Sequence, residues 1–173
     1  KLTHELGGQH SWGVIMSRQK ESMTIPPEKL HQLLTYCIEF AEMMLKDSGE
    51  FYPFGAVLDP EHEIRAVGAD IGNEQPSPGE LYQFLGNAFI QQAKSGEISA
   101  AAIACNVNIP EEYEPPVRDG VRVHIECDGF SRYLYVPFII ESKGFIKKTT
   151  DVTFYEPIPV AIDAQIFDST QNA

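Results

Sequence analysis

The sequence predicts an α+β domain in which two helices pack on one face of a sheet of five or six mainly antiparallel strands. Three observations lead to this prediction. Residues 27–46 and 78–94 repeat apolar side chains at helical spacing and keep one polar face. Short apolar runs separated by turn residues fill much of the remaining chain, as is typical of antiparallel strands. Because each helix has one wet and one buried face, we expect both to lie on the sheet rather than in a bundle.

The segment Glu50–Gly68 predicts a β-hairpin near the centre of this sheet. Apolar runs at 51–58 and 64–67 flank a polar turn that begins with Asp59-Pro60. Proline presets φ at the second turn position, and the aspartate before it can accept a local backbone hydrogen bond. Gly55 inside the first strand indicates that another part of the molecule approaches the backbone closely. We expect that neighbour to be a helix, with a bound ligand as the alternative.

The helix boundaries carry local signals. Pro27 stands in the first turn of the first helix, and Gly49 follows its last apolar residue. Ser77 and Glu80 have the spacing of a capping box, with Pro78 at the first helical position between them. These signals predict where each helix begins and where the first one ends.

Four further strands are expected at 98–109, 121–127, 130–140 and 152–155. In the second of these, apolar residues alternate with Arg122, His124 and Glu126. We interpret the alternation as a strand with one solvated face, and a polar site made by the three side chains is the alternative. Asp128-Gly129 predicts a type I′ hairpin turn. The chain from Glu156 onward is expected to run over the surface.

The length of 173 residues fits a single domain with a proper core. We divide the chain into an N-terminal extension (1–22), one α+β domain (23–160) and a C-terminal tail (161–173). The extension shows no sustained hydrophobic period. Its two histidines, His4 and His10, do not amount to a metal site, because such sites need three or four oriented ligands.

The charge balance limits the partners. Thirteen basic against 25 acidic residues give a net charge of -12. Such a charge repels nucleic acids and anionic membrane surfaces and attracts a basic protein. The three cysteines, Cys37, Cys105 and Cys127, form no close pair and lie in apolar patterns, which suits a reducing compartment. We therefore expect a cytoplasmic protein that binds neither nucleic acid nor membranes, and we leave its oligomeric state open.

The run Pro53-Phe54-Gly55-Ala56-Val57 resembles a strand of the cytidine- and guanine-type deaminases. The order helix, hairpin, loop, helix also resembles the opening of that fold. That family binds zinc through a His-Ala-Glu at the start of the second helix and a later Pro-Cys-x-x-Cys. Here Pro78-Gly79-Glu80 stands at that helix start, and no Cys-x-x-Cys occurs. The resemblance therefore implies a related fold without the zinc chemistry, and we expect no metal and no cofactor.

A wider pattern, residues 51–58 followed by an acidic turn and Glu63-Ile64 after a long helix, resembles a group of small uncharacterised bacterial proteins. This resemblance implies a bacterial cytoplasmic α+β domain. Some small acidic domains of this type accompany toxins as immunity proteins, so by analogy the domain is expected to bind a partner.

No dinucleotide-binding, P-loop or nucleophile-elbow motif is present, and neither Cys105 nor Cys127 has a setting that lowers a thiol pKa. We therefore expect no catalytic residue and predict a non-catalytic binding domain with an acidic surface. The alternative is a small-molecule-binding protein or enzyme with a pocket near Gly55 and Glu80. The candidate binding residues of the two hypotheses together are Glu111, Glu112, Tyr113, Glu114, Glu80 and His124.

Overall fold

A computed structural model describes residues 23–68, 72, 76–144 and 149–168. Within these residues the elements follow in the order α2 (Pro27–Ser48), β1 (Phe54–Leu58), β2 (Ile64–Val67), α3 (Pro78–Ser95), β3 (Ala100–Asn108), the 3-10 helix η1 (Glu111–Tyr113), β4 (Asp119–Cys127), β5 (Phe130–Lys143), β6 (Thr149–Phe154) and β7 (Ile158–Ala161). The predicted α+β class is confirmed. The predicted N-terminal extension lies outside the described residues.

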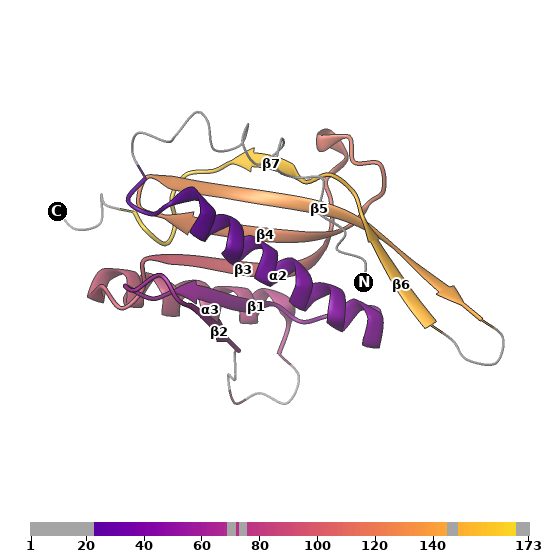
Figure 1. The fold of residues 1–173 in the computed structure, drawn as a ribbon, viewed down its shortest axis with the longest axis horizontal. Helices are drawn as coiled ribbons and strands as arrows, with labels where there is room; N and C mark the ends of the chain where they lie inside the picture. The colour runs from indigo at the N-terminus through magenta and orange to yellow at the C-terminus, as the bar shows by residue number, and fades with distance from the viewer. Residues whose placement is uncertain (1–22, 69–71, 73–75, 145–148, 169–173) are drawn as a thin grey trace.

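The strands form one curled, antiparallel sheet in the order β2-β1-β3-β4-β5-β6, and β7 also pairs with β5 (Figure 1). Strand β5 is long enough to pair Phe138–Lys143 with β6 and Arg132–Tyr135 with β7. The sheet therefore has seven strands, one more than the upper expectation. Residues 158–161 were expected in a surface tail because Pro159 argues against a strand. As β7 pairs only with β5, it is an edge strand, and edge strands tolerate proline.

Both helices begin and end where the capping signals place them. In α3, the Ser77 side chain accepts from the Glu80 backbone N–H and the Glu80 side chain accepts from the Ser77 backbone N–H. Helix α2 ends at Gly49, whose left-handed φ of 76° lets its backbone N–H reach the Leu45 carbonyl. The capping box and the glycine stop are therefore confirmed.

The two helices lie on opposite faces of the sheet, which differs from the expected packing on one face (Figure 1). Helix α2 packs in a core that includes Ala56 and Ala102, whereas α3 packs in a second core that includes Val57 and Ala101. Neighbouring residues of a strand point to opposite faces, so these two sets cannot share a face. Amphipathicity shows that a helix lies on a sheet but not which face it covers, and for this reason the sequence argument missed the arrangement.

The hairpin of β1 and β2 forms as predicted and fits tightly against α3, but it lies at the edge of the sheet and not near its centre, because β2 is the first strand of the order and pairs with β1 alone. Asp59 Oδ1 accepts hydrogen bonds from the backbone N–H groups of Glu61 (3.0 Å) and Glu63 (2.9 Å). A Cβ atom added at Gly55 would lie 2.5 Å from the ring of Phe89 in α3. Gly55 is therefore a site of helix packing, and the expectation of a neighbouring helix is confirmed.

The hairpin between β4 and β5 also forms, with a different turn. Cys127 pairs with Phe130 across the two-residue loop, as predicted. Gly129 has a φ of 77°, but Asp128 does not have positive φ. A type I′ turn needs positive φ at both loop residues, so the predicted turn type is wrong.

Candidate functional site

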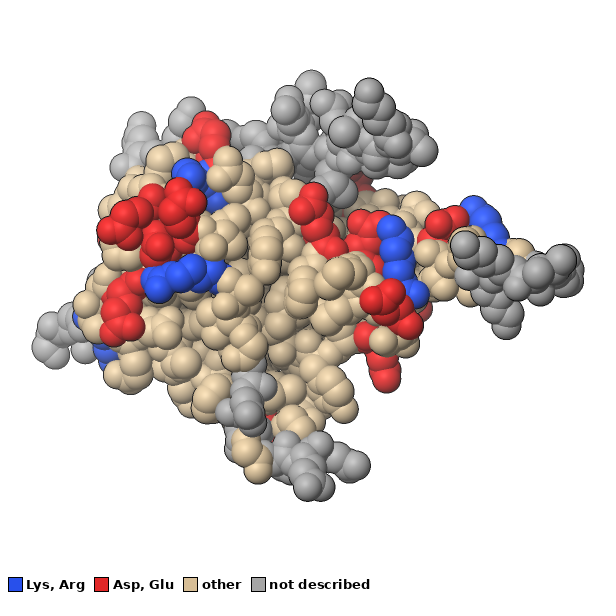
Figure 2. Space-filling model, turned by 60° about the horizontal axis from the view of Figure 1, so that its bottom comes forward, with Lys and Arg blue, Asp and Glu red and all other residues tan. Residues whose placement is uncertain are grey.

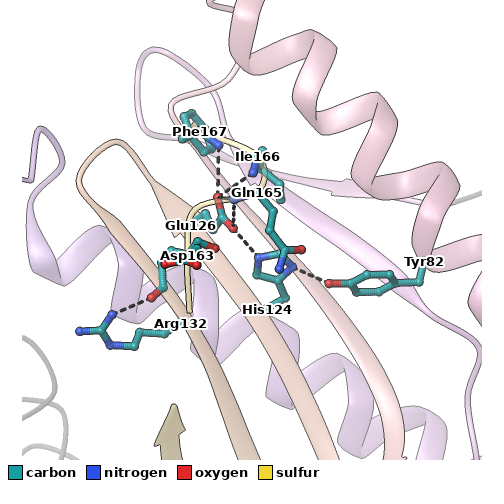
Figure 3. Close-up of polar contacts among 9 residues, drawn as sticks. Tyr82, His124, Glu126, Arg132, Asp163, Gln165, Ile166 and Phe167 are labelled. Atoms are coloured by element: carbon teal, nitrogen blue, oxygen red, sulfur yellow. Dashed lines mark hydrogen bonds and ion pairs between the residues drawn. The ribbon is translucent and has the colours of Figure 1, made fainter. Parts of the chain in front are cut away.

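The polar side chains of β4 are buried rather than solvated. His124 is 1% exposed and Glu126 is fully buried. Helix α3 covers them on one side, and residues 162–168, which we call the C-terminal segment, cover them on the other (Figure 3). The interpretation of this alternation as a solvated face is therefore wrong. His124 and Glu126 are hydrogen-bonded to each other, whereas Arg122 contacts Tyr82, Tyr133 and Cys105.

Glu126 joins β4 to the C-terminal segment. Its carboxylate accepts hydrogen bonds from three successive backbone N–H groups, those of Gln165 (2.9 Å), Ile166 (2.8 Å) and Phe167 (3.1 Å). Burial by itself would raise the pKa of Glu126, but the hydrogen bonds from His124 and from these backbone groups outweigh it and lower the pKa. The group is therefore an ionised carboxylate that holds the segment against the sheet.

His124 links Glu126 to helix α3. Its Nε2 lies 2.6 Å from Glu126 Oε1, and its Nδ1 lies 2.6 Å from the Tyr82 hydroxyl oxygen. An ionised carboxylate only accepts, so Nε2 carries a proton and donates it to Glu126. In the neutral ring Nδ1 then accepts, and the Tyr82 hydroxyl donates to it. The three side chains form one hydrogen-bonded chain from α3 to the C-terminal segment, as Figure 3 shows.

Arg122, two residues earlier on β4, lies between two aromatic rings. Its guanidinium carbon is 4.9 Å from the centroid of Tyr82 and 4.7 Å from that of Tyr133. Its Nη2 is 4.0 Å from the Cys105 sulfur, and its buried Nε has no hydrogen-bond acceptor among the described residues. Arg122 is thus fixed by stacking rather than by an ion pair.

Two cysteines and one tyrosine near the site are held in their neutral forms. Burial raises the pKa of Cys105, although the Arg122 guanidinium partly offsets this. Burial raises the pKa of Cys127 to about 12. The pKa of Tyr82 is also raised, first by burial and then by the neighbouring Tyr133 hydroxyl. These thiols and this phenol therefore remain protonated near neutral pH.

A pocket of about 310 Å³ opens beside His124, between α3 and the C-terminal segment. Buried Ile103 and Ile166 contribute apolar surface to it. The complete lining is Tyr82, Gln83, Gly86, Asn87, Ile90, Ile103, His124, Gln165 and Ile166. The lining contains no Asp, Glu, Lys or Arg side chain.

The structure separates the two predicted pocket residues, Glu80 and His124, from each other. Of the candidates, His124 lines the pocket, whereas Glu80 is exposed and engaged in the cap of α3. Neither Gly55 nor Glu80 is among the residues that line the pocket beside His124. Sequence reasoning missed Tyr82 and the segment around Gln165, which complete the site.

The four candidates of the acidic connection lie in and just after η1. Glu111 forms an ion pair with Arg118, and the ring of Tyr113 packs 5.3 Å from that of Tyr135. Glu112 and Glu114 are exposed. Figure 2 shows one face of the molecule, on which acidic side chains form separate groups with uncharged surface between them.

Within the described ranges, no three His, Cys, Asp or Glu side chains are grouped so as to hold a metal ion. No helix in those ranges is both long and apolar enough to cross a membrane. Comparisons of the chain with protein-family models, with curated proteins and with solved structures found no match. The chemistry of the site must therefore be argued from its own geometry.

Proposed function

We propose that this chain is a non-catalytic binding domain whose pocket beside His124 takes a small, uncharged, polar molecule. The observation that carries the proposal is the composition of the lining. Three amide side chains, those of Gln83, Asn87 and Gln165, stand at the exposed rim around buried isoleucines. Amides donate and accept hydrogen bonds, so they suit a ligand that also does both.

The hydrogen bonds that link Tyr82, His124 and Glu126 support binding rather than catalysis. A general base needs a free lone pair, and both ring nitrogens of His124 are engaged by Tyr82 and Glu126. A nucleophile needs a lowered pKa or an adjacent free base, whereas the pKa values of Cys105 and Tyr82 are raised. These groups are arranged to hold the walls of the pocket in place.

The same lining favours a neutral ligand. A charged ligand in this pocket would lose hydration without meeting an Asp, Glu, Lys or Arg side chain on the lining, which is unfavourable. A volume of about 310 Å³ is at the lower end of the range for small-molecule sites. The ligand class is therefore a small amide or alcohol with an apolar part that packs on the isoleucines.

Gly86→Leu is expected to abolish this binding while keeping or raising stability. Gly86 lines the pocket, and a Cβ atom built there meets no other atom within 4 Å. A leucine there would fill the pocket and would also improve helix propensity by up to about 1 kcal/mol. Titration with benzamide, followed through the side-chain amide NMR signals of Gln83, Asn87 and Gln165, should shift these signals in the wild type only.

Gly79→Leu is the matched control. Gly79 is also in α3 and has room for a Cβ atom, but it does not line the pocket. This variant should bind benzamide like the wild type. Benzoate has the same shape with a negative charge and should shift the amide signals of the pocket residues less than benzamide does. Equal benzamide binding by Gly86→Leu and the wild type would rule out this pocket.

A second candidate function rests on the net charge of -12 and on the exposed acids Glu112 and Glu114. We propose that a basic protein partner, such as the toxin of an immunity pair, would contact this connection. Steering by charge would raise the association rate, and the binding would weaken with added salt. The charge also argues against nucleic acid as a partner.

The double variant Glu112→Gln/Glu114→Gln is expected to weaken capture of such a partner at low salt. This pair leaves the ion pair of Glu111 and Arg118 in place. The control Glu61→Gln/Glu63→Gln removes the same two charges from the turn between β1 and β2. Pull-downs from the source cell at low and high salt compare how much partner each double variant and the wild type capture. Unchanged capture by the first variant would exclude the connection as the contact.

We also propose the bacterial cytoplasm as the location. Cys37, Cys105 and Cys127 are all free and buried, which supports a reducing compartment. The resemblance of residues 51–58 to small bacterial proteins supports the same assignment.

A further inference from the structure

We propose that Arg122 is the recognition residue of a second binding site, which takes an oxyanion such as a carboxylate or phosphate group. This site is separate from the pocket beside His124, whose lining does not include Arg122. The proposal rests on three observations about the guanidinium: its missing counter-charge, its fixed orientation and its aromatic surroundings.

The first observation is a half-buried positive charge without an opposite charge. No described carboxylate lies within ion-pair distance of Arg122, although the whole chain has 25 acidic residues. Glu126 lies on the same face of β4, but its carboxylate already accepts hydrogen bonds from His124 and from the C-terminal segment. Within hydrogen-bond reach of Arg122 the described residues offer only the Cys105 sulfur, a weak acceptor at 4.0 Å. Most of the donors of the guanidinium therefore have no protein acceptor.

The second observation is that the guanidinium is already oriented. The rings of Tyr82 and Tyr133 lie 4.9 and 4.7 Å from its central carbon and restrict its rotation. Stacking of this kind attracts the cation but leaves its charge in place. The planar guanidinium presents its N–H donors as a rigid fork that matches the two oxygens of a carboxylate or phosphate. The guanidinium is already ordered in the folded protein, so little further side-chain entropy would be lost when a ligand binds.

The third observation is the row of tyrosines beside Arg122. The ring of Tyr133 lies 6.3 Å from that of Tyr135, and the ring of Tyr113 follows at 5.3 Å from Tyr135. These rings lower the local polarity around the cation, and a charge pair is stronger in such surroundings than in water. The row leads from Arg122 to η1. Tyr135 within it is buried, but Tyr133 beside Arg122 is only partly buried, so an oxyanion attached to a ring can pack on Tyr133.

The test compares the thermal unfolding of wild type and Arg122→Gln in phosphate, acetate, phenyl phosphate and benzoate, each against chloride at equal pH and ionic strength. A ligand that binds only the folded state raises the unfolding temperature as its concentration increases. Phosphate also stabilises folded proteins generally, and that rise is common to both proteins. We expect a further rise for the wild type with an oxyanion that Arg122→Gln lacks. Comparing phosphate with acetate shows which class of oxyanion binds. Comparing phenyl phosphate with phosphate, and benzoate with acetate, shows whether an attached ring strengthens the binding.

Arg132→Gln is the matched control. Arg132 is also half-buried and lies over an aromatic ring, that of Phe130 at 5.3 Å, but it donates to the Ser131 carbonyl at 2.7 Å. This variant should keep the full response to oxyanions. If Arg122→Gln does not fold, the Arg122 Nε–H NMR signal of the wild type, titrated with phosphate and with benzoate, decides the question.

The proposal is overturned if the wild type responds to all four oxyanions as it does to chloride, or if Arg122→Gln keeps the full response. Either result would leave Arg122 as a spacer between two tyrosines. Because Tyr82 lines the pocket and also stacks on Arg122, the two sites are separated with Gly86→Leu, which changes the pocket, leaves Arg122 in place and should keep the full oxyanion response. The two sites can therefore fail or succeed independently.

Discussion

Glu126→Gln is expected to lower the free energy of unfolding by about 3–5 kcal/mol, the usual cost of breaking a buried charged network. Each carboxylate oxygen of Glu126 accepts from N–H donors. Oε1 faces His124 Nε2 and the Gln165 N–H, and Oε2 faces the N–H groups of Ile166 and Phe167. In either orientation the amide NH₂ of glutamine would point at donors instead of acceptors. The substitution is nearly isosteric, so the loss comes from hydrogen bonding rather than from packing.

Chemical denaturation of both proteins at pH 7 measures this difference, with Glu39→Gln on the exposed side of α2 as the control. The control should lie within about 0.5 kcal/mol of the wild type. Because the pKa of Glu126 is lowered on folding, its contribution is complete above its ordinary value of 4.5 and is lost as the pH falls through the lowered value. The gap between wild type and Glu126→Gln should therefore narrow below about pH 4.5. A gap under 1 kcal/mol at pH 7 would contradict the role given to this carboxylate.

The elements that the sequence predicted well are those with local signals. The capping box of Ser77 and Glu80, the glycine stop at Gly49 and the turn at Asp59 each involve residues only a few positions apart. Such contacts form in any fold that contains the element, so spacing alone identifies them. The choice of sheet face depends on how distant segments pack, and no local spacing reports it.

The polar cluster was harder to predict because alternation has two meanings. A strand with polar residues at every second position can face water or can face other polar groups in the interior. A signal that separates the two was present on the neighbouring strand, where Ile103 pairs with His124 and Ala101 pairs with Glu126. An unbroken apolar run in β3 implies that both faces of the sheet are covered there. Reading the two strands together would have predicted burial of His124 and Glu126.

The C-terminal segment could not be recognised from its side chains. It contributes backbone N–H groups to Glu126, and every residue other than proline has one. Its one buried side chain in the described part, Ile166, is a single apolar residue without a period around it. For these reasons a segment that completes the site was taken for a surface tail.

Ending the chain at Ala164 is expected to destabilise the wild type by about 3–5 kcal/mol, because it leaves the buried Glu126 carboxylate without its three backbone donors. It also uncovers the apolar surface that Ile166 buries, which by itself is worth about 1.5–3 kcal/mol. Ending the chain at Asp168 is the control, because it keeps every contact described here. The free energies of unfolding of the two truncated proteins, measured with denaturant, separate the contribution of residues 165–168 to stability from that of the last five residues.

Combining the truncation with Glu126→Gln tests whether the carboxylate and the segment act as one unit. If they do, the truncation costs less in Glu126→Gln than in the wild type, with a coupling of about 0.5–3 kcal/mol. The cost of the truncation that remains in Glu126→Gln measures the apolar surface buried by Ile166, which does not depend on the charge at position 126. Equal costs in the two backgrounds would mean that the segment is held by packing alone. In that case His124 and Tyr82 would be positioned by β4 and α3 without help from the C-terminal segment.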